Sequence, residues 1–130
     1  MSEPMRYLID TTFVIDHLRG APAARDWIAR AAEVGDQLFV SEVVVAEAWA
    51  GAHSDVDPDL EVFLRFLEFI QPGPDIARAA GRWRANARSR GRTLSMTDAL
   101  IAAAAHSLDA VVLTRNLHDF APTPVTIEPY

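Results

Sequence analysis

The stretch Arg6-Tyr7-Leu8-Ile9-Asp10-Thr11-Thr12 joins a short apolar run to one acid and two hydroxyl residues. The apolar run predicts a buried strand, and open α/β folds keep their sites at the carboxyl edge of the sheet, where such a strand ends. We therefore interpret Asp10 as the first of several acids that meet at this edge to hold a metal ion. An aspartate between a strand and a helix can instead serve only as the helix N-cap.

Short strands alternate with helices along the rest of the chain. Further strands are predicted at 37–40, 69–70, 110–114 and 125–127. Strands separated by helices favour an α/β fold with a mostly parallel sheet covered on both sides, in a single domain spanning 1–130. The helices that separate the strands are predicted at 12–18, 22–34, 42–49, 58–67, 76–90 and 95–108.

Length and composition limit the chemistry. The chain has 130 residues, half of them hydrophobic, which is enough for a core without disulfides. It contains no cysteine, so thiolate sites are excluded and the ligands must be oxygen or nitrogen atoms. No apolar run resembles a signal peptide or a membrane-spanning helix. We expect a soluble, cytoplasmic protein.

Two acids in the middle of the chain are candidates to join Asp10. Glu47 shares a predicted helix face with Val43 and Val44, so its carboxylate would project from an apolar surface and require a cation; an exposed helix edge is the alternative. Asp98 follows Ser95 at capping-box spacing, which also places it in a first helical turn near the sheet edge. For Asp98 we favour a role in the site.

A polar turn follows the strongly β-branched strand at 110–114. In this turn Thr114 could orient a water, Asn116 could supply a carbonyl oxygen and Asp119 a carboxylate, although Asn and Asp are also ordinary turn residues. Which of Asn116 and Asp119 faces the site stays open. The histidines have no metal-ligand spacing, and all four are predicted to lie at the surface: His17, His53, His106 and His118.

Carboxylates gathered at one edge repel one another and need a cation or protons to coexist. Oxygen ligands favour Mg²⁺ or Mn²⁺, and such an ion can activate a water and stabilise charge on a phosphodiester oxygen. This is the logic of a metal-dependent nuclease.

The net charge of −6 argues at first against a nucleic-acid partner. The basic residues, however, are all arginine, and six of the twelve lie between Asp75 and Asp98 without one acid. These arginines are candidates for RNA phosphate contacts, Arg82, Arg88 and Arg92 above all. The alternatives are a solvated helix face and an acidic partner protein.

Four segments in this order resemble the motifs of PIN-domain ribonucleases, and more closely those of VapC toxins from bacterial type II toxin–antitoxin modules: 7–12, 43–51, 97–105 and 112–120. The resemblance covers essentially the whole chain. It implies a three-layer α/β/α sandwich with a mostly parallel four- to five-stranded sheet. It also implies a Mg²⁺- or Mn²⁺-dependent endoribonuclease that arrests translation and growth.

By position in this family, the metal-binding acids would be Asp10, Glu47 and Asp98, with Thr12 beside the first. Asn116 departs from an aspartate found in many relatives, and Asp119 is the substitute we expect in the catalytic set. The family further implies an RNA substrate, a homodimer, and a VapB-type antitoxin that assembles with it into a heterotetramer or larger complex. Operator DNA would be bound only through the antitoxin.

Two rival functions follow from the same residues. A phospho-acceptor signalling domain also gathers acids beside magnesium but needs a lysine near them, and this chain has none. The second rival is a catalytically weak PIN-fold subunit that acts mainly as an antitoxin-binding partner in a DNA-bound regulatory complex. Asn116 motivates it, and calorimetric titration with Mg²⁺ or Mn²⁺ would discriminate.

Overall fold

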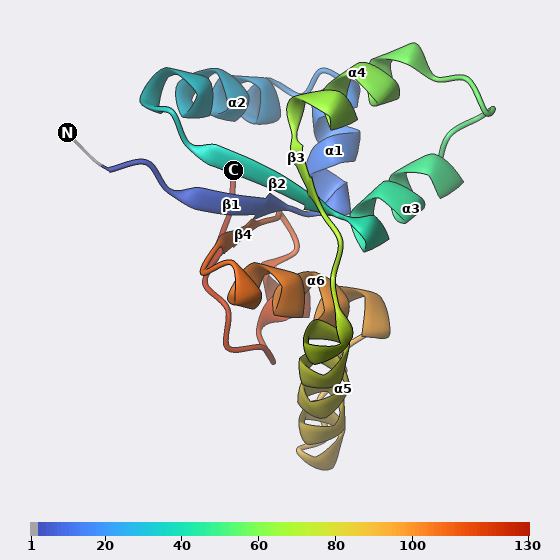
Figure 1. The fold of residues 1–130 in the computed structure, drawn as a ribbon, viewed down its shortest axis with the longest axis vertical. Coiled ribbons are helices and arrows are strands. Elements are labelled where there is room, and N and C mark those ends of the chain that lie inside the picture. Colours follow the sequence, from blue (N-terminus) through green and yellow to red (C-terminus); the bar gives the residue numbers. More distant parts are fainter. Residues whose placement is uncertain (1–2) are drawn as a thin grey trace.

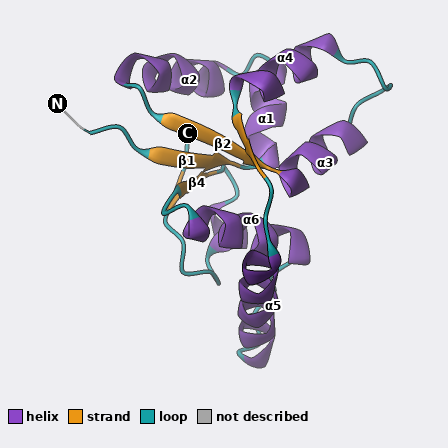
Figure 2. Ribbon diagram, viewed as in Figure 1, coloured by secondary structure: helices purple, strands orange, loops and turns teal. Residues whose placement is uncertain are grey.

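A single parallel sheet forms the middle layer of the molecule. The computed structural model describes residues 3–130, and Figure 2 shows the strands gathered between helices on either side. All four strand pairings are parallel, in the order β3-β2-β1-β4-β5, so the expected mostly parallel sheet is entirely parallel. The strands are β1 (Arg6–Ile9), β2 (Gln37–Ser41), β3 (Glu68–Ile70), β4 (Val111–Leu113) and β5 (Ile127–Glu128).

Helices cover both faces of the sheet, which confirms the α/β/α sandwich. In Figure 1, α1, α2 and α4 lie on one side of the sheet, and α6 with α5 packed against it lies on the other. Within residues 3–130 no helix is both long and apolar enough to span a membrane. The helices are α1 (Thr11–Leu18), α2 (Pro22–Val34), α3 (Glu42–Ala50), α4 (Pro58–Phe66), α5 (Pro74–Ser89), α6 (Met96–Ser107) and α7 (Leu117–Phe120).

Most predicted elements are confirmed within a residue or two, and the differences lie near the C-terminus. The strand expected at 125–127 begins two residues later, and the turn expected after β4 contains the one-turn helix α7. Gly35 ends α2 as predicted, in the left-handed conformation (φ 77°) that glycine adopts without steric cost.

The alternation along β1 decides which way Asp10 faces. The ring of Tyr7 packs edge-on against Trp27 of α2 (ring centroids 4.8 Å apart), whereas the guanidinium of Arg6 donates to the carbonyl of Leu108 at the end of α6 (3.1 Å). Successive side chains of a strand point to opposite faces. Residues 6, 8 and 10 therefore share the face covered by α6.

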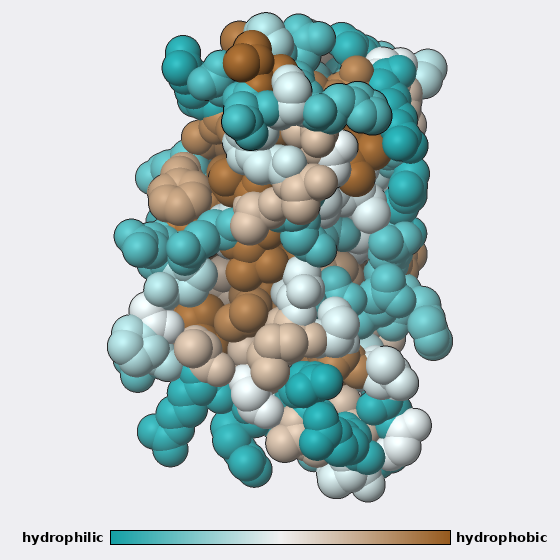
Figure 3. All heavy atoms as spheres, turned by 90° about the vertical axis from the view of Figure 1, so that its right-hand side faces the viewer, coloured by the Kyte–Doolittle hydropathy of each residue, from teal (hydrophilic) through white to brown (hydrophobic). Residues whose placement is uncertain are grey.

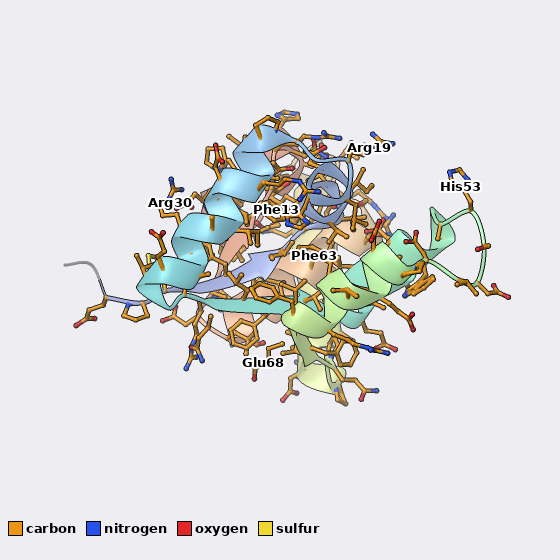
Figure 4. The ribbon with its side chains drawn as sticks, turned by 90° about the horizontal axis from the view of Figure 1, so that it is seen from above. Phe13, Arg19, Arg30, His53, Phe63 and Glu68 are labelled. Carbon is orange, nitrogen blue, oxygen red and sulfur yellow. The ribbon has the colours of Figure 1, made fainter. Side chains whose placement is uncertain are left out.

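Aromatic side chains fill the layer between the sheet and the helices of the other face. Figure 4 shows Phe13 and Phe63 pointing into the interior, while Arg30 and His53 point away. His17 stacks on Phe63 with ring centroids 4.2 Å apart, and its Nδ1 is buried without a hydrogen-bond partner among the described residues. His17 is therefore half-buried, and the expectation of a surface position holds for it only in part. Burial lowers its pKa, and Arg25 adds to this.

A polar cluster ties the turn after β4 to α1 and to the end of the chain. Asp16 accepts hydrogen bonds from Nη1 of Arg115 (2.7 Å) and from the hydroxyl of Tyr130 (2.6 Å). The side chain of Asp16 is only 13% exposed, so both bonds are partly shielded from water. Burial and the hydrogen bond to Asp16 raise the pKa of Tyr130. The cluster anchors the segment that carries Asn116 and Asp119.

Asp16→Ala is expected to lower the free energy of unfolding by about 2 kcal/mol, because it removes the hydrogen bonds that Arg115 and Tyr130 donate to a poorly solvated charge. Urea denaturation followed by circular dichroism measures the change. Glu61→Ala is the matched control: it removes the exposed ion pair with Arg65 (3.8 Å) and should cost less than about 0.5 kcal/mol. Equal losses in the two variants would contradict the anchoring role of Asp16.

Candidate active site

Three polar residues end three adjacent strands in one row. Leu8 pairs with Phe39 in β2, and Ile9 pairs with Leu113 in β4. The ladder continues one residue further, since the backbone N–H of Asp10 donates to the carbonyl of Leu113 (3.1 Å). This register sets Asp10 between Ser41 and Thr114, and paired residues of parallel strands point to the same face. All three side chains therefore face the layer of α6.

Asp10 is the buried acid of this row, with an exposed fraction of 5%. Its Oδ2 accepts hydrogen bonds from the hydroxyls of Thr114 (2.8 Å) and Thr12 (3.2 Å). The backbone N–H of Asn116 donates to Oγ1 of Thr114 (2.9 Å), which completes a relay that fixes the orientation of the carboxylate. Asp10 occupies the N-cap position of α1 without a side-chain capping bond, so the helix-cap alternative does not account for its side chain.

Burial raises the pKa of Asp10. The hydrogen bond from Thr114 opposes that shift most strongly, and the charge of Glu47 adds to it. A buried carboxylate that stays near other negative charges favours the uptake of a proton or a cation.

Asp98 enters the same region from the first turn of α6. The Ser95 hydroxyl accepts a hydrogen bond from the backbone N–H of Asp98 (3.0 Å), which confirms the predicted capping interaction. Burial raises the pKa of Asp98 to about 6 against the opposing hydrogen bond with Ser95. The negative charges of three other acids contribute to this rise: Asp10, Asp119 and Glu47. Asp98 therefore lies within electrostatic range of the three other predicted acids.

Glu47 lies at the exposed edge of this group. The expected desolvated setting is wrong, because α3 turns Val44 and Ala48 inward and leaves Glu47 facing solvent. Its Oε1 nevertheless accepts a hydrogen bond from the hydroxyl of Thr11 (2.6 Å). Since Thr11 directly follows Asp10, this bond joins α3 to the end of β1.

The turn after β4 separates the roles of Asn116 and Asp119. Asn116 occupies the N-cap position of α7 and contributes its backbone N–H to Thr114. Asp119 lines a cavity of about 600 Å³ together with Asp98, and its charge acts on Asp98. The geometry therefore favours Asp119 as the further acid of the site and Asn116 as a supporting residue.

The arginines of α5 and the following loop differ in their distance from this cavity. Arg92 lines it beside Asp98. Arg88 lines a smaller neighbouring cavity together with Arg92 and with Arg84, which was not among the three arginines singled out from the sequence. Arg82 lines neither cavity.

Two further residues lie at the site but were not predicted as site residues from the sequence. In the sequence Thr11 is only part of the first motif, and Ser41, directly before the helix predicted at 42–49, is predicted by residue type to be its N-cap. Ser41 does occupy that position but makes no capping hydrogen bond, and its fully buried hydroxyl has no partner among the described residues. Its hydroxyl type at a strand end was visible in the sequence, but its place next to Asp10 depends on the strand order.

The donor atoms at this edge suit a hard cation. They are carboxylates and hydroxyls, and the unpartnered Ser41 hydroxyl lies on the face that Asp10 shares. Within residues 3–130, however, no three acidic or imidazole groups form a compact set of metal ligands. Magnesium in proteins is often held by one or two carboxylates and several waters, so the fit rests on oxygen donors around Asp10 and Asp98.

An all-parallel α/β/α sandwich with carboxylates at the carboxyl edge of its sheet defines the class of this protein. The family model of the PIN domain matches residues 7–122. Ribonuclease VapC19 of Mycobacterium tuberculosis is 39% identical over 123 residues, which cover 95% of this chain and 98% of the relative.

Solved structures agree with this similarity. VapBC-1 from nontypeable Haemophilus influenzae has a TM-score of 0.82 and 25% identity, covering 96% of this chain and 98% of that chain. DNA-bound VapBC from Salmonella typhimurium has a TM-score of 0.81, with the same identity and coverage. The chain belongs to the PIN-domain family.

The raised pKa of Asp98 predicts a pH dependence of stability in EDTA. Its folded value, about 6, lies above the ordinary 3.8, so the folded state binds the proton more tightly and the contribution of Asp98 to stability falls as pH rises between these values. Asparagine does not titrate, so the Asp98→Asn variant should lack this loss of stability. The unfolding free energy of the variant minus that of the wild type, measured by urea denaturation, should therefore increase from pH 4 to pH 7. Asp26→Asn, at an exposed position of α2, should show no such trend.

The unpartnered hydroxyl of Ser41 predicts that Ser41→Ala leaves the unfolding free energy in EDTA unchanged or raises it by up to about 1 kcal/mol, because no protein hydrogen bond is lost. Thr114→Val is the comparison, since it removes a hydroxyl bonded to a buried carboxylate and should cost about 2 kcal/mol. A larger loss in Ser41→Ala than in Thr114→Val would contradict this assignment.

Proposed function

We propose that this protein is a metal-dependent endoribonuclease and the toxin of a type II toxin–antitoxin module. The observation that carries the proposal is the buried Asp10, fixed by Thr114 at the sheet edge where the charges of Glu47, Asp98 and Asp119 converge. The 39% identity to a protein named Ribonuclease VapC19 supports RNA as the substrate. Cleavage of RNA would arrest translation and growth.

In this proposal Asp10, Glu47 and Asp98 hold Mg²⁺ or Mn²⁺, and Asp119 completes the catalytic group. When bound, the ion supplies a nucleophilic water and stabilises charge on the phosphodiester oxygens.

The supporting residues orient the donors. Thr12 and Thr114 both bind Oδ2 of Asp10 and so hold its carboxylate in one orientation. The backbone N–H of Asn116 donates to the hydroxyl oxygen of Thr114. The hydroxyl proton of Thr114 therefore points away from Asn116 and is donated to Asp10. Thr11 holds Glu47 toward the same edge.

The same proposal includes protein partners. VapBC-1 of Haemophilus influenzae and the DNA-bound VapBC of Salmonella typhimurium are named as VapBC structures, which supports a VapB-type antitoxin here. We expect a homodimer that forms a heterotetramer or larger complex with the antitoxin and reaches operator DNA only through it. Figure 3 shows a vertical band of hydrophobic side chains on one face, and exposed apolar residues of α4 and β3 suit such contacts: Val62, Phe66 and Phe69.

The test is cleavage of structured RNA by the purified chain in Mg²⁺ or Mn²⁺, followed on gels. Discrete cuts should appear, vanish with EDTA, and fall at least about 100-fold in Asp10→Ala and in Asp98→Ala, because each loses a carboxylate of the metal site. Asp26→Ala, at an exposed position of α2, is the control and should cut like the wild type. Cleavage retained in both Asp10→Ala and Asp98→Ala would overturn the assignment of the site.

A further inference from the structure

A second, smaller cavity lies beside the cavity of Asp98 and Asp119. It has a volume of about 160 Å³, and no acid lines it. Its lining consists of three arginines and two residues of the loop that follows α5: Arg84, Arg88, Arg92, Thr93 and Leu94. A small pocket bounded by three guanidinium groups suits a compact anion.

The end of α5 brings these arginines together. Arg84 and Arg88 are four residues apart and so lie one above the other on the same helix face. Gly91 then adopts a left-handed conformation (φ 70°), and the backbone N–H of Arg92 returns to the carbonyl of Ala87 (2.9 Å). This Schellman-type turn folds the chain back, so that Arg92 lies beside the last turn of the helix.

The cavity is strongly basic in an acidic protein. Within residues 3–130 the ion pairs are Arg65 with Glu61 and Arg115 with Asp16, so no acid forms an ion pair with Arg84, Arg88 or Arg92. Nε of Arg84 donates to the carbonyl of Leu94 (3.2 Å). This bond steadies the guanidinium and uses only Nε, so the two terminal amino groups stay available for a ligand. A planar guanidinium group can bind two oxygens of one phosphate at the same time, through two parallel hydrogen bonds.

The two cavities share part of their walls. Arg92 and Thr93 line the larger cavity with Asp98 and Asp119, and they also line the smaller one. An anion at the arginines would therefore lie next to a ligand at the acids. A strand of RNA presents this pattern, because its phosphates follow one another along a flexible backbone.

We propose that the cavity formed by Arg84, Arg88 and Arg92 binds a phosphate of single-stranded RNA that neighbours the phosphodiester held at the acids. This inference rests on the proposed function and adds where the substrate runs: across Arg92 and along the C-terminal end of α5. The alternative ligand is an acidic segment of a partner protein, which would bind the arginines but would not need the adjacent cavity of Asp98 and Asp119.

The test measures binding of a short fluorescent single-stranded RNA by anisotropy in EDTA, at several salt concentrations. Arg88→Ala combined with Arg92→Ala should raise the Kd roughly tenfold or more, as expected for lost charge-assisted hydrogen bonds. The logarithm of the association constant decreases linearly with the logarithm of the salt concentration, and this slope should become less steep by about 0.7 for each phosphate contact removed. Arg88→Glu alone should weaken binding further than Arg88→Ala.

Arg78→Ala is the control for the loss of one arginine, because it removes a single charge from an exposed position of α5 that lines neither cavity, and it is compared with Arg88→Ala and Arg92→Ala singly as well as combined. Its Kd should stay within about twofold of the wild type. If the double variant behaves like Arg78→Ala in both Kd and salt slope, the inference is overturned and the arginines serve an acidic protein segment or solvent.

The outcome is separable from that of the nuclease proposal because binding is measured without metal. A chain that binds RNA through Arg88 and Arg92 but does not cut it would support this inference and contradict the proposed function. If the wild-type chain cuts RNA and the double variant binds RNA as Arg78→Ala does, the proposed function is supported and this inference is contradicted.

Discussion

The hydrogen bond from Thr114 to Asp10, 2.8 Å long, joins the end of the central strand β1 to the end of its neighbour β4, and the rest of the site is arranged around it. A carboxylate that is only 5% exposed is costly to bury without partners. The hydroxyls of Thr114 and Thr12 reduce that cost, and both bind the same oxygen. The carboxylate is therefore held in one orientation at the sheet edge, where the first turn of α6 brings Asp98.

The charges of the protein are separated in space, which explains how a chain of net charge −6 can bind a polyanion. Three acids act on the charge of Asp98 at the sheet edge, where a cation would reverse the local charge. The arginines lie beyond them at the end of α5, and Arg92 belongs to the walls of both cavities. The turn at Gly91 is the structural element that brings the two regions into contact, because it reverses the chain after the helix.

Much of the fold followed from local pattern. The apolar run of β1 and the cap at Ser95 were predicted because each signal depends on residues close in sequence. The errors share one cause, since they concern the partners of a side chain. Glu47 was expected on an apolar surface, but α3 packs through Val44 and Ala48 and leaves it exposed. His17 was expected at the surface but is half-buried, because α4 brings Phe63 over its ring.

The sequence by itself determined the elements, the acidic residues at their ends and the acid-free run of arginines, because periodicity, capping and residue type are local properties. Only the tertiary structure decided that Ser41, Asp10 and Thr114 stand in one row, because strand order and register set neighbours that are far apart in the chain. It also placed Asp119 in the wall of the cavity that Asp98 lines, and added Arg84 to the basic cavity. Such choices depend on which elements pack together, and packing is a property of the whole fold.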